Sequence, residues 1–468
     1  MPTSKSRSKL VVVSNRGPYR TMTVSGKRTL VRAAGGLVAA LDPVLRARGG
    51  VWVCAKEAAD TNLAADQMLA KLPYQLVRVP LSARDRDAFY SGISNALLWP
   101  ILHSLPPTVR ISPTPWQSYE KANEEFAKAV LQSSKPSDLI WVQDFHLMLM
   151  PGMLRKARSR ARIGWFCHIP WPSADLFNIL PWRRQILEGL IGADLIGFHT
   201  QAYAENFLEC VAMQTNAQVD TARMTAKVGG RTVRVVVAPI GVPVDELQTL
   251  ASDPRVTAYA AKIHEWVHGR RILLAVDRLD YTKGIPQRLH AFEQLLRSDR
   301  SARERYVLLQ VMVPSRTDVK AYAELKQEID RLVGDINGRY ASAGRVPIQY
   351  LYRNLSQDQL LAHYLAADVA VVTPLRDGMN LVAMEYCAAR IHGGGRLVLS
   401  EFAGAAQFLK DALIVNPYDI HALSKSMRGA IELDDDQAVD RMKGLRAAVH
   451  KLDVHRWADD YLKLLERP

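Results

Sequence analysis

The feature of this sequence that most constrains its fold is a repeated alternation between short β-branched apolar runs and longer amphipathic stretches. Such alternation is typical of βαβ units, in which helices connect parallel strands. Most of the runs are apolar throughout, as strands covered on both faces should be. We therefore expect strands at 10–14, 51–54, 76–79, 139–142, 163–168, 195–199 and 235–239, and then at 272–276, 306–313, 348–352, 369–373, 397–400 and 412–415.

Two series of strands predict two doubly wound α/β domains. The segment 239–243 reads Pro-Ile-Gly-Val-Pro and is the natural joint, because proline and glycine interrupt regular structure. We expect an N-terminal Rossmann-like domain over 1–240 and a second one over 241–452. Ligands of such sheets bind outside the carboxyl ends of the strands, so two facing domains would place them in a cleft. The stretch 318–340 is an amphipathic helix whose apolar face, from Leu325 to Ile336, belongs to the core.

Composition excludes several classes of protein. The chain has 468 residues, of which 48% are hydrophobic and 23% charged, so intrinsic disorder is excluded. Its four cysteines form no CxxC pair, which indicates buried thiols in a reducing cytoplasm rather than a zinc site. The apolar run at 10–13 is too short for a signal peptide. The sequence contains no run of 18 apolar residues, so we expect no membrane span and no membrane partner. The net charge of +14 is spread without a compact basic stripe, so we expect no nucleic-acid partner.

The second domain opens with the string Leu-Ala-Val-Asp-Arg-Leu-Asp-Tyr-Thr-Lys-Gly at 274–284. A buried strand leads into Arg278 and Lys283, which lie in a polar turn that ends in glycine. Two cations at the carboxyl end of a strand suit a diphosphate, since arginine gives a forked contact and lysine a point charge. From the residues alone, a pair of surface ion-pair residues is an equally good interpretation.

A second strand-to-helix junction spans 372–385 and contains the string Asp-Gly-Met-Asn-Leu-Val. Asp377 and Gly378 predict a tight turn, and we expect a helix to begin within 379–382. A helix N-terminus at the end of a parallel strand binds anions without a metal. Glu385 follows on a face that could reach a ribose. Taken alone it could be a surface carboxylate, but the whole string is too unusual to be filler.

Polar residues also follow three predicted strands of the first domain. Arg16 follows the first strand and precedes the pair Gly35-Gly36, Asp144 and His146 follow another, and His168 follows the next. All of them would line one rim of the expected cleft. The two histidines lack metal-ligand spacing, and for a lone histidine we favour a hydrogen-bonded structural role.

Together these strings resemble glycosyltransferase family 20 over nearly the whole chain, from Leu10 to about Trp457. The most specific strings are those at 276–284 and 373–382 and the segment Ser-Glu-Phe-Ala-Gly at 400–404; 98–100 and 168–172 are supporting matches. The resemblance implies a GT-B fold, with the acceptor on the first domain and the nucleotide-sugar on the second. It also implies a C-terminal helix over 453–468 that crosses back to the first domain.

The resemblance implies a retaining glucosyltransferase that transfers glucose from a nucleoside-diphosphate-glucose to glucose 6-phosphate, giving trehalose 6-phosphate. The departing diphosphate would accept the proton of the incoming hydroxyl on the same face, with no protein nucleophile, metal or other cofactor. The catalytic set implied is Arg278, Lys283, Asp377, His168 and Asp144. The donor site would add Gly35, Gly36, Gly378, Met379, Asn380, Leu381, Val382 and Glu385, and the acceptor site would comprise Arg16, Tyr90, Trp99, Asp144 and Arg316.

The chain departs from the family pattern near the expected acceptor site. Where synthases of the family carry a Gly-Trp-Ser/Pro-Gly string, this chain reads Val-Trp-Val-Cys-Ala-Lys at 51–56. Lys56 and the strings at 16–19 and 99–104 also resemble the branch that glucosylates glycerol 3-phosphate. The strings at 34–37 and 314–316 resemble the trehalose branch, and we favour glucose 6-phosphate because of Arg316. A pseudo-glycosyltransferase or a sugar-phosphate sensor is a further alternative, the nucleotide stays open, and we expect a homo-oligomer because the family commonly forms them.

Overall fold

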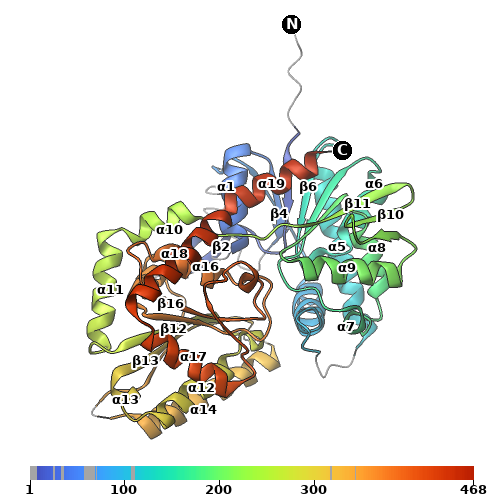
Figure 1. Cartoon of the computed structure of the whole chain (residues 1–468). Coiled ribbons are helices and arrows are strands. Elements are labelled where there is room, and N and C mark those ends of the chain that lie inside the picture. The colour runs from blue at the N-terminus through green and yellow to red at the C-terminus, as the bar shows by residue number, and fades with distance from the viewer. Residues whose placement is uncertain are drawn as a thin grey trace. The chain divides into compact units, whose positions relative to one another are not determined.

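The structure is a computed structural model that describes residues 8–24, 27–32, 36–56, 69, 71–106, 111–316, 319–342 and 344–467 (Figure 1). Its described part forms two compact units, one comprising residues 1–240 with 454–468 and the other residues 241–453. Each unit is built on a mainly parallel sheet, which confirms the predicted α/β class. All four cysteines are buried, as expected. No helix in the described ranges combines the length and the apolar character that crossing a membrane requires.

The sheet of the first unit contains nine strands among the described residues, in the order β5-β4-β1-β6-β7-β8-β11-β10-β9. Its neighbours from β5 to β11 pair in parallel, whereas β10 pairs antiparallel with both β11 and β9. The strands are β1 (Leu10–Val13), β4 (Val51–Ala55), β5 (Gln75–Val79), β6 (Leu139–Gln143), β7 (Arg162–Phe166), β8 (Leu195–Phe198), β9 (Gln218–Asp220), β10 (Thr225–Val228) and β11 (Arg231–Val237).

Two features of this unit are absent from the sequence prediction. One is the antiparallel hairpin of β2 (Tyr19–Val24) and β3 (Lys27–Arg32). The other is the pair of short strands β9 and β10, and β10 turns into β11 through Gly229 and Gly230, whose positive φ values of 54° and 77° suit a tight hairpin turn. These strands are polar, so they lack the apolar runs on which the prediction depended.

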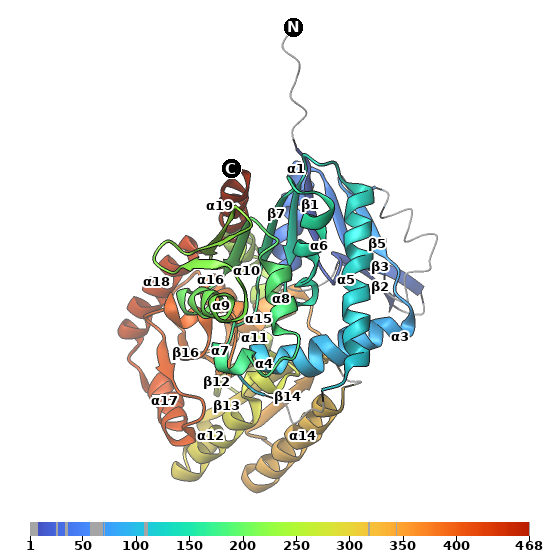
Figure 2. The same cartoon turned by 90° about the vertical axis from the view of Figure 1, so that its right-hand side faces the viewer.

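Helices pack against this sheet, and Figure 2 shows α5 alongside β5. The helical segments are α1 (Gly36–Arg48), α3 (Ala83–Arg86), the π-helix η1 (Asp87–Leu98), α4 (Trp99–Leu102), α5 (Pro113–Ser133), η2 (Phe145–Leu147), α6 (Met150–Ala157), α7 (Ala174–Phe177), α8 (Arg183–Leu190), α9 (Gln201–Gln214) and α19 (Val454–Glu466).

The last helix, α19, belongs to the first unit and lies beside α1 (Figure 1). The Tyr461 hydroxyl lies 2.9 Å from the carbonyl oxygen of Trp165 and 3.0 Å from that of Leu195, so one side chain bonds to both β7 and β8. A Cβ atom on Gly197 would lie 2.8 Å from the Tyr461 ring, and glycine there lets the helix approach. The helix is therefore built into this unit by specific contacts.

The second unit has a six-stranded, fully parallel sheet within the described residues, in the order β14-β13-β12-β15-β16-β17. Its strands are β12 (Arg271–Arg278), β13 (Tyr306–Val313), β14 (Ile348–Tyr352), β15 (Val369–Val372), β16 (Arg396–Ser400) and β17 (Leu413–Val415). Its helical segments are α10 (Val244–Ala251), α11 (Pro254–Trp266), η3 (Tyr281–Lys283), α12 (Ile285–Ser298), α13 (Ala302–Arg305), α14 (Lys320–Tyr340), α15 (Gln357–Ala366), α16 (Leu381–Ala389), η4 (Gly404–Gln407), α17 (Ile420–Glu432) and α18 (Asp435–Lys451).

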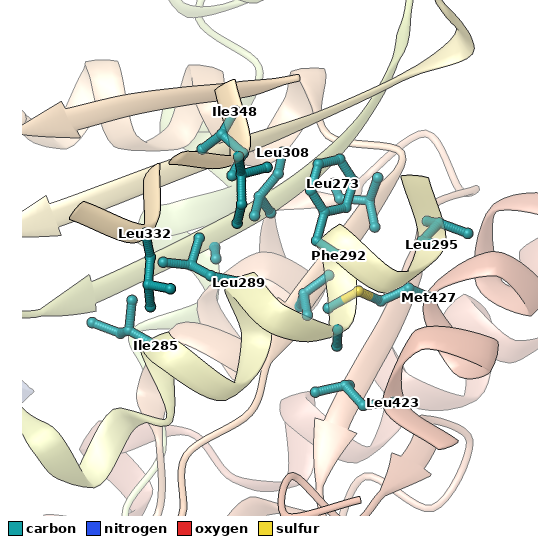
Figure 3. Packing of buried hydrophobic residues seen from close by; sticks show 14 of the residues in the cluster. Leu273, Ile285, Leu289, Phe292, Leu295, Leu308, Leu332, Ile348, Leu423 and Met427 are labelled. Carbon is teal, nitrogen blue, oxygen red and sulfur yellow. The ribbon is translucent and has the colours of Figure 1, made fainter. Parts of the chain in front are cut away.

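The core of the second unit forms where α12 packs on the sheet (Figure 3). Leu289 and Phe292 of this helix are fully buried, together with Leu273 of β12 and Leu308 of β13. The apolar face predicted for 318–340 is likewise buried in α14, from Leu325 to Ile336. This packing fixes the carboxyl ends of β12 and β15, from which the predicted donor residues follow.

Candidate functional site

The predicted diphosphate turn follows β12 and is ordered by Asp280. Its Oδ1 accepts hydrogen bonds from the backbone N–H of Thr282 at 3.1 Å and from the Thr282 hydroxyl at 3.0 Å. The turn ends at Gly284, which has a φ of +63° and whose added Cβ would lie 2.3 Å from the carbonyl oxygen of Thr373. Only glycine combines that backbone conformation with so close an approach. Arg278, at the end of β12, is exposed.

The two strings predicted to bind the donor meet in the structure. Lys283 donates a hydrogen bond of 2.6 Å from Nζ to Oδ2 of Asp377, and the two side chains are only 12% and 13% exposed. The backbone N–H of Leu375 also bonds to the carbonyl of Thr282 at 2.7 Å. A lysine ammonium and a carboxylate are thus held together at the carboxyl edge of a parallel sheet, where such folds bind ligands.

The helix predicted within 379–382 begins at Leu381, so Met379 and Asn380 precede it. Asn380 is its N-cap, in the left-handed region at φ 74°, and its side-chain oxygen accepts a hydrogen bond from the N–H of Ala383. A Cβ on Gly404 would lie 2.0 Å from the carbonyl oxygen of Gly378, so the segment 400–404 packs closely on this loop. The positive N-terminal end of α16 therefore follows Asp377 after only the three residues 378–380.

Glu385 is a partly buried carboxylate, contrary to the interpretation as a surface residue. It accepts a hydrogen bond of 2.8 Å from the hydroxyl of Tyr364. Burial raises the pKa of Glu385 to about 7, although the Tyr364 hydroxyl acts in the opposite direction. Burial likewise raises the pKa of Tyr364 well above its ordinary value. Glu385 therefore changes charge near neutral pH.

Arg316, predicted to bind the acceptor phosphate, lies in the second unit next to the diphosphate turn. Its Nη1 is 3.3 Å from Oδ2 of Asp280, and it also donates to the hydroxyl of Tyr322. The side chain is 5% exposed, and its φ of 49° places it in the left-handed region. Asp280 therefore contacts both the turn that carries Lys283 and this arginine.

In the first unit, Asp144 and His168 lie together at the carboxyl ends of β6 and β7. Oδ1 of Asp144 accepts a hydrogen bond of 3.2 Å from the backbone N–H of His168, and the imidazole Nε2 is 2.9 Å from Oε1 of Gln143. Asp144 adopts φ 70° and ψ 173°, a conformation that costs free energy and is concentrated at functional sites. Burial, together with His199, holds the pKa of His168 well below its usual range, so the ring is neutral.

Arg16 and Tyr90 also lie together. Arg16 is exposed, and its Nη2 donates a hydrogen bond of 2.6 Å to the Tyr90 hydroxyl, while the Tyr90 ring stacks on His146 at 5.8 Å. Tyr90 lies in the π-helix η1, a rare conformation that occurs frequently at functional sites. Trp99 follows it, is 5% exposed, and packs against Phe145 with ring centroids 5.6 Å apart.

Other sequence predictions are placed as follows. Gly35 lies outside the described residues, and Gly36 begins α1. Lys56 follows β4, and its N–H bonds to the carbonyl of Val79 at 2.8 Å. The described residues contain no group of three or more potential ligands that could hold a metal ion. A cavity of about 560 Å³ at the amino edge of the second sheet is lined by none of the predicted site residues.

Sequence reasoning missed three polar residues that contact the predicted site: Gln143, Asp280 and Arg288. Asp280 lies within the quoted string 274–284, where an aspartate two residues before a threonine is a recognisable capping signal. Gln143 ends a buried strand, and Arg288 lies on the buried face of α12. A buried polar residue acquires meaning only from its three-dimensional partners.

Comparisons with known proteins give matches over nearly the whole chain. The sequence profile of glycosyltransferase family 20 matches residues 8–467. A trehalose-6-phosphate synthase from Mycolicibacterium smegmatis is 41% identical over 472 residues, which cover 99% of this chain and 93% of that protein. A bifunctional trehalose-6-phosphate synthase/phosphatase from Thermoproteus tenax is 40% identical over 465 residues. The match covers 97% of this chain but only 63% of the Thermoproteus protein.

Solved structures give the same result for the fold. A structure described as trehalose-6-phosphate from E. coli bound with UDP-2-fluoro glucose has a TM-score of 0.88 at 32% identity, covering 98% of this chain and 99% of that one. An alpha,alpha-trehalose-phosphate synthase (UDP-forming) from Burkholderia xenovorans in complex with glucose-6-phosphate has the same TM-score and identity, covering 98% and 100%. The predicted GT-B fold is confirmed, and this chain belongs to glycosyltransferase family 20.

Proposed function

We propose that this chain transfers glucose from UDP-glucose to glucose 6-phosphate, giving trehalose 6-phosphate with retention of the α configuration. Membership of the family makes the chain a retaining glycosyltransferase. The observation that carries the proposal is the 2.6 Å contact between Lys283 and Asp377, which joins two sequence-distant loops at the carboxyl edge of the second sheet. Similar structures with UDP-2-fluoro glucose and with glucose-6-phosphate support the choice of substrates.

In this proposal the second unit binds the nucleotide-sugar. Arg278 and Lys283 bind the diphosphate, because their positive charges oppose the negative charge that grows on the leaving group. The positive end of α16 adds to this field, and Asp377 with the loop 378–382 binds the glucose hydroxyls. Glu385 contacts the ribose.

The first unit binds the acceptor. Arg16 binds the phosphate of glucose 6-phosphate, and Tyr90 holds that arginine through its hydroxyl. Asp144 binds acceptor hydroxyls, and the neutral His168 lies beside the donor glucose, where an uncharged ring exchanges hydrogen bonds without opposing the positive charge of the reacting sugar. Arg316 is the second phosphate-binding residue, and Trp99 supports the site by packing on Phe145.

The chemical step follows from positioning and from stabilisation of the leaving group. The bond between the anomeric carbon and the diphosphate oxygen breaks, and the incoming hydroxyl attacks from the same face. Its proton passes to the departing diphosphate, so the products are UDP and trehalose 6-phosphate. No side chain of the chain has to form a covalent bond to the sugar.

The test is a turnover matrix that follows the release of nucleoside diphosphate. UDP-, GDP- and ADP-glucose are each paired with glucose 6-phosphate and with glycerol 3-phosphate. We expect turnover with UDP-glucose and glucose 6-phosphate. Turnover with glycerol 3-phosphate alone would assign the chain to the other branch and make Ala55 and Lys56 the first residues to mutate. Nucleotide binding without turnover in any pair would support a sensor.

A further inference from the structure

Arg288 is a fully buried arginine that has no role in the proposed mechanism. It lies on the inner face of α12 and its side chain is 0% exposed. Its Nη1 donates to Oδ2 of Asp277 at 2.5 Å and to Oε1 of Gln310 at 3.0 Å. Its Nε donates to the Thr373 hydroxyl at 3.0 Å, and its Nη2 donates to the backbone carbonyl of Lys283 at 3.3 Å. One guanidinium therefore contacts four separate segments.

These partners adjoin the residues that would bind the donor. Asp277 immediately precedes Arg278 in β12, and Lys283 offers its own carbonyl to the guanidinium. Thr373 follows β15 and begins the loop that leads to Asp377, and its carbonyl oxygen is the atom that Gly284 approaches most closely. The guanidinium thus connects both ends of the diphosphate turn to the loop that carries the carboxylate.

A requirement for stability alone does not account for this arrangement. A buried ion pair can usually be replaced by apolar side chains of similar volume without loss of stability. A planar guanidinium, in contrast, donates in fixed directions and sets the distances between the groups that accept from it. A side chain that sets the distances between chain segments has to bond to several of them, and Arg288 bonds to acceptors on four.

We infer that Arg288, with Asp277, is a positioning residue that holds the diphosphate turn and the Asp377 loop at the separation needed for turnover, an inference that rests on the proposed function. Arg288 acts through the backbone at Arg278 and Lys283 and does not touch the substrate. A displacement of about 1 Å in a reacting geometry can reduce turnover about 100-fold, so the effect is measurable.

The experiment separates positioning from stability with a charge-neutral pair. Arg288→Met alone leaves the Asp277 carboxylate buried without its partner and should lower both the melting temperature and kcat. The double variant Asp277→Leu/Arg288→Met leaves no buried charge unpaired and should recover most of the lost melting temperature; the remaining loss comes from Gln310 and Thr373, which lose hydrogen-bond partners. The control is Arg396→Met, which removes another buried arginine of the same unit. Arg396 begins β16, at the amino ends of the strands, and donates to the carbonyl of Leu433 and to Asp435. Full-length variants are compared in kcat with UDP-glucose and glucose 6-phosphate and in UDP affinity by calorimetry.

We expect the double variant to keep a kcat about 100-fold below wild type after most of the lost melting temperature has recovered, and the Arg396 variant to keep wild-type kcat. Wild-type kcat and UDP affinity in the double variant would overturn the inference. If the methionine variants do not fold, Arg288→Lys decides, because it keeps the charge but cannot reach four acceptors, and wild-type kcat in it would likewise overturn the role. If the wild-type protein shows no turnover, the proposed function fails, and the UDP affinities alone decide about Arg288.

Discussion

The polar cluster of the second unit and that of the first unit differ in how they are held. Lys283 and Asp377 are nearly buried, bonded to each other, and attached to loops that share further backbone hydrogen bonds. Arg16 is exposed and donates a hydrogen bond to Tyr90, which lies on a helix of rare geometry. The second-unit cluster is held in place by these bonds before a ligand arrives, whereas the exposed side chain of Arg16 is held less tightly. The difference suits the proposed roles, in which the second-unit cluster stabilises a leaving group and the first-unit cluster recognises an acceptor.

The largest effect we expect is that of Lys283→Ala. Removing one preorganised cation from the leaving group should lower kcat by about 10²–10³-fold, as for the loss of one donor in an oxyanion hole. Some stability should also be lost, because the nearly buried Asp377 carboxylate loses its cation and keeps the hydrogen bond from Asn380, so kcat is compared well below the melting temperature of the variant. Steady-state kinetics and a thermal melt on the same preparation measure both quantities.

The matched control is Lys326→Ala, which removes a lysine that is 23% exposed and paired with Asp330 on α14 of the same unit. That variant should retain wild-type kcat. Near-normal turnover of the Lys283 variant together with a lower melting temperature would make Lys283 structural and would remove the contrast between the two clusters.

A smaller effect is expected for Arg16→Ala, in KM rather than in kcat. Loss of a charge-assisted contact to the acceptor phosphate should cost about 2 kcal/mol, which raises the KM for glucose 6-phosphate roughly 30-fold and leaves the KM for the donor unchanged. Initial rates at varied acceptor and at varied donor concentration separate the two constants.

Arg223→Ala is the control for this measurement, since that arginine is 82% exposed in the β9–β10 hairpin. Tyr90→Phe, which removes only the hydroxyl that bonds to Arg16, should raise the acceptor KM in the same direction by a smaller factor. An acceptor KM that Arg16→Ala does not alter would exclude this arginine from the acceptor site.

The same contrast explains how much could be predicted from the sequence. The residues proposed to bind the donor lie in two continuous strings, and local rules on strand ends, tight turns and helix starts already bring Arg278, Lys283 and Asp377 to one edge of a sheet. Apolar runs also predicted every strand of the parallel core, because burial on both faces leaves that pattern. The polar strands β2, β3, β9 and β10 were missed for lack of it.

The first-unit cluster and the buried network depend on contacts that no local pattern encodes. Arg16 and Tyr90 are 74 positions apart, and Tyr90 lies on a π-helix, which the sequence analysis did not predict. The left-handed Asp144, the bond between Gln143 and His168, and the four contacts of Arg288 follow from tertiary packing. The roles assigned to the individual residues stay predictions until variants are measured.

The smallest effect we expect is a change of stability with pH. It tests whether Glu385, at the proposed donor site, is buried from water. The pKa of Glu385 is raised to about 7 by burial, from an ordinary value of 4.5. A carboxyl group whose pKa is raised by folding contributes its stability fully below the unfolded pKa, and this contribution is lost as the pH rises through the folded pKa. Between pH 6 and pH 8 the contribution of Glu385 to the free energy of unfolding should therefore fall by about 1 kcal/mol.

Glu385→Gln should remove this part of the pH dependence while the hydrogen bond from Tyr364 persists. Urea denaturation at both pH values measures it, with Glu328→Gln on the exposed face of α14 as the control. An identical slope in wild type and Glu385→Gln would mean that the Glu385 carboxylate is solvated, and that the donor cluster is open to water at its ribose end.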